Sequence, residues 1–180
     1  MHERIRLLQR YAEIALMGIG LLAHVGFLLK IVKSESQEAT IDRKIKSEAV
    51  SQIKEALRLA RIVEDNFRFS IIEISAIPNS NTEKNRALLD EIKNTARTIS
   101  NDLYETVETV ENALEQLIET PTCGRAWSRE WRLAFDALHS RTQTSIHSVM
   151  KALEEVQNFP FKYPHRIGQA HIKNSGPQDD

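Results

Sequence analysis

Residues 14–29 read IALMGIGLLAHVGFLL, and His24 is the only polar side chain among them. Two further apolar residues extend the run to residue 32. A helix needs about 20 apolar residues to cross a bilayer, and a flanking lysine such as Lys30 can reach the interface through its long side chain. We therefore predict a single-pass membrane helix at residues 14–32, preceded by a basic segment at residues 1–13. A buried core helix and an interfacial helix are the alternatives that this length leaves open.

Small residues recur along this segment, which contains three of the six glycines of the chain. Glycine costs a soluble helix about 1 kcal/mol relative to alanine, whereas membrane helices tolerate it. Small residues on one face let two helices approach closely in lipid. Four positions lie near one such face: Ala15, Gly18, Leu22 and Gly26. We predict that they form the interface of a homo-oligomer. The predicted partners are therefore membrane lipid, because of the membrane helix, and further copies of the chain, because of this interface.

Charge and cysteine content indicate the compartment. Lysine and arginine are slightly more numerous after the apolar segment than before it, and this excess favours a cytoplasmic location for the helical body. Cys123 is the only cysteine, so no disulfide can form within the chain, as is usual for proteins in a reducing compartment. The formal net charge is -1, which provides no overall field to attract nucleic acid.

The region 40–158 has three runs of apolar residues with alternating spacings of three and four, the pattern of helices that bury one seam. The second run extends from Leu89 to Leu117 and the third from Trp127 to Val156. The first run comprises Ala49, Ile53, Ala56, Ala60, Val63, Phe67, Ser70, Ile74 and Ile77. Short proline-containing breaks separate the runs. We predict an all-α fold of long antiparallel helices, as a three-helix bundle or as coiled-coil-like hairpins.

Charged residues predict how these helices pair. Folding the chain back about Thr122 sets Glu111 opposite Arg132 or Leu133, so we expect the second and third helices to be neighbours. An acidic stripe follows the second helix: Asp102, Glu105, Glu108, Glu111, Glu115 and Glu119. Such a stripe could line a cation path or meet a basic partner, or it could be a solvated or paired face.

Metal and cofactor sites find little support in the sequence. His139 and His147 share a helical face, but eight residues at about 1.5 Å each place them about 12 Å apart, too far for one ion. No HExxH or CxxC pattern occurs. We therefore predict no metal and no cofactor.

One motif resembles that of a known family. Residues 166–171 read RIGQAH, an RxxxxH form similar to the nuclease motif of HEPN domains, helical bundles that often act as RNA-cleaving dimers. The resemblance implies that Arg166 stabilises charge on a scissile phosphate while His171 moves protons. Arg141 and His147 form a looser variant of the motif.

The last 22 residues, 159–180, form a segment with three of the five prolines and no helical period, and we predict an extended arm. Its aromatic and basic residues suit single-stranded nucleic acid or anionic lipid headgroups. The predicted partner-binding residues are Phe161, Lys162, Tyr163 and Arg166. The same side chains suit an arm that packs onto its own bundle.

These observations together favour a non-enzymatic, single-pass membrane protein that acts as a homo-oligomeric pore or as a membrane-localised accessory or scaffold protein. The alternative is an HEPN-like helical protein that binds or cleaves RNA through Arg166 and His171.

Overall fold

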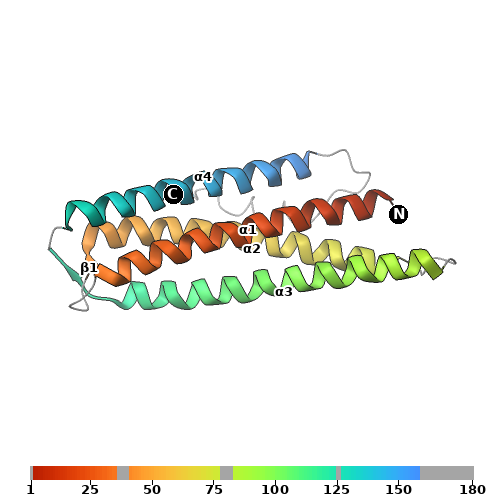
Figure 1. Cartoon of the computed structure of the whole chain (residues 1–180), viewed down its shortest axis with the longest axis horizontal. Helices are drawn as coiled ribbons and strands as arrows, with labels where there is room; N and C mark the ends of the chain where they lie inside the picture. The colour runs from red at the N-terminus through yellow and green to blue at the C-terminus, as the bar shows by residue number, and fades with distance from the viewer. Residues whose placement is uncertain (1, 36–40, 78–82, 125–126, 159–180) are drawn as a thin grey trace, which may run out of the picture.

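The computed structural model of the chain describes residues 2–35, 41–77, 83–124 and 127–158, and four long helices account for most of them. They are α1 (His2–Glu35), α2 (Arg43–Ser75), α3 (Glu83–Glu119) and α4 (Arg129–Gln157). Successive helices run in opposite directions along one long axis (Figure 1). The predicted all-α fold is confirmed, and the predicted arm at residues 159–180 lies outside the described residues.

The N-terminal helix α1 packs against each of the other three helices. It lies between α3 and α4, which flank the α1–α2 pair on opposite sides (Figure 1). The apolar segment 14–32 is the middle of this long helix. In this structure it belongs to the same bundle as the helices of region 40–158.

Helix α2 follows the predicted seam closely. All nine predicted positions are buried, from Ala49 near its start to Ile77 just beyond its end. The helix begins at a cap, because the side chain of Asp42 accepts a hydrogen bond of 3.0 Å from the backbone N–H of Ile45. An apolar stripe of this kind is buried because it removes large side chains such as Phe67 from water.

The predicted pairing of α3 with α4 about Thr122 is wrong. Glu111 does not meet Arg132; its Oε2 atom lies 2.7 Å from Nη2 of Arg61 on α2. Arg132 instead pairs with Glu48 of α2 at 3.1 Å. The physical reason is the position of α1. This helix occupies the space between α3 and α4, so each of them finds its ion-pair partner on α2.

A two-residue strand pair ties the two loops at one end of the bundle. Strand β1 (Ile41–Asp42) runs parallel to β2 (Thr122–Cys123), with Ile41 opposite Thr122. The backbone N–H of Ile41 also donates to the carbonyl of Pro121 at 2.9 Å. The connection between α3 and α4 is thereby held against the start of α2.

Candidate functional site

The side of α1 that no other described helix covers is apolar. Leu16 and Phe27 are 54% and 55% exposed, and the small residues Gly20 and Ala23 are exposed between them. These four residues form the outer face of α1. Water-exposed helix surfaces normally carry polar side chains, so this apolar face is the candidate interaction site of α1.

Charged residues bound the outer face at both ends. Glu13 precedes it and its side chain is 62% exposed, and Lys30 follows it and is also exposed. The chain has no charged residue between these two positions. Of the helices in the described part of the chain, α1 alone is long and apolar enough to cross a membrane.

The opposite side of α1 is packed into the bundle. Ala15 and Leu22 are at most 1% exposed. A Cβ atom added to Gly18 would meet Leu103 at 3.6 Å and Val63 at 3.8 Å, which is ordinary contact with α3 and α2. Three of the four predicted interface residues thus face the interior of this bundle, whereas Gly26 is exposed. Self-association through this set of four remains a prediction.

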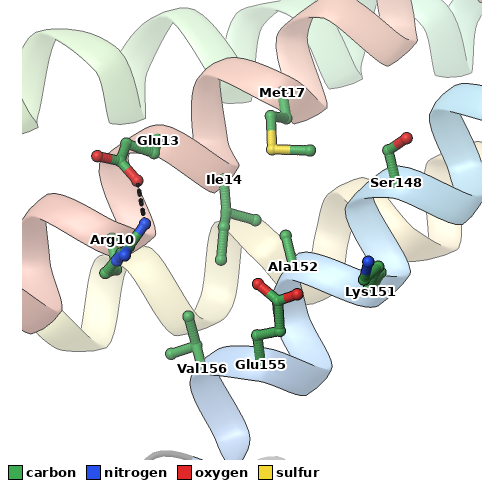
Figure 2. A pocket seen from close by; sticks show the side chains of 9 residues that line it. All are labelled: Arg10, Glu13, Ile14, Met17, Ser148, Lys151, Ala152, Glu155 and Val156. Atoms are coloured by element: carbon green, nitrogen blue, oxygen red, sulfur yellow. Dashed lines mark hydrogen bonds and ion pairs between the residues drawn. The ribbon is translucent and has the colours of Figure 1, made fainter.

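A groove of about 360 Å³ separates α1 from α4 beside the outer face (Figure 2). Ile14 and Met17 of α1 and Ala152 of α4 contribute apolar side chains to it. Its rim is charged and includes the ion pair of Arg10 with Glu13, whose atoms lie 3.0 Å apart.

A second groove, of about 470 Å³, separates α1 from α3 near the other end of the outer face. Leu29 and Val110 line it, with Lys30 and Lys33 at its edge. Lys33 donates a hydrogen bond of 3.0 Å to Gln116 of α3. The outer face therefore runs between two grooves at opposite ends of α1.

Polar side chains attach the middle of α4 to its neighbours. Nδ1 of His24 on α1 lies 2.8 Å from Oγ of Ser145. Gln52 of α2 donates from Nε2 to the carbonyl of His139 at 2.8 Å. Its Oε1 atom is buried and has no hydrogen-bond partner among the described residues.

The acidic stripe on α3 is partly paired within the chain. Arg61 of α2 binds both Glu108 and Glu111 of α3, and it also binds Glu64, which is 3% exposed. Hydrogen bonding to Glu111 raises the pKa of Arg61 above its ordinary value, so the guanidinium stays charged. This arrangement makes part of the stripe a paired face between α2 and α3.

The described part of the chain contains no group of three histidine, cysteine or acidic side chains that could hold a metal ion. The ring of His139 packs against that of Phe135 at 5.8 Å, whereas Arg141 and His147 are exposed on α4. The nuclease candidates Arg166 and His171 and the other arm residues Phe161, Lys162 and Tyr163 lie outside the described residues.

Sequence reasoning missed the outer face because it followed the small residues and not the large ones. Leu16, Gly20, Ala23 and Phe27 are spaced by four, three and four, a helical period that would have identified a second apolar side of α1. Comparisons of the chain with protein-family models, with curated proteins and with solved structures give no match.

Proposed function

We propose that this protein is a non-enzymatic helical scaffold or accessory protein that works as a homo-oligomer assembled through the outer face of α1. The observation that carries the proposal is the exposure of Leu16 and Phe27, at 54% and 55%, on a helix side without charge. Complete burial of such a side chain is favourable by about 1.5–3 kcal/mol, and since each is already about half buried, covering the rest is favourable by roughly 1 kcal/mol each.

The presence of glycine at position 20 is consistent with close packing of a second helix against the outer face. Nothing lies within 4 Å of the position that its Cβ would take, so packing within the chain does not require the absence of a side chain there. Glycine in an exposed helix is nevertheless unfavourable by about 1 kcal/mol relative to alanine. A second helix lying over Gly20 and Ala23 would use this space, because small residues allow helix axes to come together.

Sedimentation of the full chain tests the proposal. We expect a dimer or larger oligomer for the unchanged protein, and a monomer of unchanged helix content when Leu16→Glu and Phe27→Glu are combined. Leu133→Glu is the control, because Leu133 is 60% exposed on α4 and is not part of the outer face. An unchanged protein that sediments as a monomer would exclude this function.

A second candidate is the single-pass membrane protein with a cytoplasmic helical body, acting as a pore or accessory protein. It is favoured by the length and apolarity of α1. Of the described helices α1 alone is apolar enough to cross a bilayer, so it cannot span one while packed against α2, α3 and α4. This function therefore requires α1 to leave the bundle and uncover residues such as Leu103 and Val63. Flotation of the full chain with lipid vesicles, resistant to high salt, is the expected result for this candidate.

A further inference from the structure

The outer face of α1 has the spacing of a two-helix seam. With the charged residues at its ends, it comprises Glu13, Leu16, Gly20, Ala23, Phe27 and Lys30, spaced alternately by three and four. This alternation is the repeat by which two helices pack side chains into one another's gaps. All six residues are exposed, so the seam is open along its whole length.

The seam is complementary to itself when it is reversed. About the midpoint between Leu21 and Leu22, position 16 exchanges with position 27 and position 20 with position 23. A large side chain thus meets a large one, Leu16 against Phe27, and the small residues meet at the centre. A central pair of small residues brings the helix axes close to the lower end of the usual 8–10 Å.

The charges at the two ends select this direction. In the antiparallel arrangement Glu13 of each copy lies opposite Lys30 of the other, and a twofold axis makes this ion pair twice. In a parallel arrangement the two Glu13 side chains would meet, as would the two Lys30 side chains, and both contacts repel. Antiparallel helix dipoles also attract one another.

We infer that the occupant of the outer face is a second copy of this chain, docked antiparallel so that Leu16 of each copy contacts Phe27 of the other. The inference rests on the proposed self-association and adds its direction and register. The grooves beside Met17 and Lys30 flank the seam and remain at its two edges.

Disulfide trapping tests the register in a Cys123→Ser background, which removes the native thiol. Leu16→Cys and Phe27→Cys are made in separate chains. Neither variant alone is expected to cross-link, because two copies of position 16 lie eleven residues apart along antiparallel helices, about 16 Å, whereas a disulfide needs Cα atoms about 4.4–6.8 Å apart. An equal mixture of the two is expected to give a covalent dimer in high yield. Cross-linking of each variant alone, with none specific to the mixture, would show a parallel dimer and overturn the inference.

Charge reversal gives a second readout on the unmodified seam. Glu13→Lys is expected to raise the dimer dissociation constant about tenfold, since it sets two ammonium groups against each other at both ends of the seam, and Lys30→Glu should do the same with two carboxylates. The double variant restores both ion pairs and should return the constant to within about threefold of the original. A parallel dimer would respond to neither single change.

The outcomes separate the two proposals. A dimer whose 16–27 mixture does not cross-link would overturn the register and leave the proposed self-association standing. A monomer in sedimentation overturns both. A monomer that floats with vesicles assigns the outer face to lipid.

Discussion

The Nδ1 atom of His24 on α1 lies 2.8 Å from the hydroxyl oxygen of Ser145 on α4. His24 is the only polar side chain in the apolar run 14–29, and in this bundle its ring nitrogen has a partner in the same chain. The contact also explains part of the polar character of the middle of α4. The hydroxyl of Ser145 contacts α1, and the amide oxygen of Gln143 accepts a hydrogen bond of 3.4 Å from Gln52 of α2.

Removing this hydroxyl is expected to weaken the bundle. Ser145→Ala should lower the free energy of unfolding by about 1 kcal/mol, because the half-buried imidazole loses its partner. Ser140→Ala is the matched control, since Ser140 is exposed on the same helix. Urea unfolding of the two variants measures the difference, and equal unfolding midpoints would refute a stabilising role for the contact.

Arg61 is expected to stabilise the fold mainly by pairing with the carboxylate of Glu64. Arg61→Met leaves this 3% exposed group with Arg68, at 3.6 Å, as its one ion-pair partner among the described residues, and it also removes the bonds to α3. We expect a loss of about 1–3 kcal/mol in the free energy of unfolding, because a buried charge loses its main partner. Arg58→Met, at an exposed position one turn earlier, should change it by less than about 0.5 kcal/mol. Equal losses in the two variants would contradict the assigned role.

The bundle is expected to tolerate alanine at position 18, which adds one side-chain carbon, but not leucine, which adds four. Gly18→Ala should raise the melting temperature, because its Cβ meets Leu103 and Val63 at ordinary contact distances while the helix gains up to about 1 kcal/mol. Gly18→Leu should lower it, since overpacking a filled core typically costs about 1–3 kcal/mol. Thermal unfolding followed by circular dichroism compares the two. If leucine were tolerated as well as alanine, α1 would not be packed closely against α2 and α3 at this point.

Two positions on opposite sides of α1 distinguish a core helix from a membrane-spanning one. Val25 is 0% exposed and Ala23 is exposed. For a core helix, Val25→Asp should abolish cooperative unfolding, because a carboxylate is buried without a partner. Ala23→Asp would dissociate the proposed dimer but should leave a monomer that still unfolds cooperatively. In a spanning helix both changes lie at similar depth and each should impair membrane insertion by a similar amount, about 2.5–3.5 kcal/mol. Unfolding curves and membrane fractionation of both variants therefore separate the two candidate functions.

The nuclease alternative has a direct test at His171. We expect purified protein to cleave no RNA and His171→Ala to leave the fold unchanged. If Arg166 and His171 do act as a catalytic pair, the substitution should reduce the cleavage rate by about 10²–10⁴ through loss of proton transfer. RNA cleavage by the unchanged protein that disappears in His171→Ala would favour the HEPN-like function over the scaffold.

The core of α2 could be predicted because its two sides differ. Polar residues such as Lys54 and Arg58 face water while Ile53 and Ala56 are buried, so the helical period is visible in the sequence. Helix α1 has no such contrast in its middle: Leu16 is exposed and Leu22 is buried, yet both are leucine. An all-apolar run is compatible with lipid or with a core, and only the faces of the other helices distinguish the two.

The partners of the charged residues could not be read from the chain. An exposed ion pair is worth only about 0.2–1 kcal/mol, so it follows the packing of apolar side chains and does not direct it. Glu111 had a sequence-matched partner in Arg132, but the helices that bring cations near it were determined by the insertion of α1. Pairing residues by folding each connection into a hairpin considers only helices that are adjacent in the sequence, so it could not include α1 between α3 and α4.

The central place of α1 has a consequence for the order of synthesis. This helix leaves the ribosome before the other three, and α4 is complete only after about 120 further residues, which take roughly 6–25 s at ordinary elongation rates. At the start of that interval the helix that will contact all the others has none of them to cover it, and α2 and α3 are complete before α4. The apolar surface of α1 is then exposed to water, and chaperones or a bilayer can bind it before the bundle has formed.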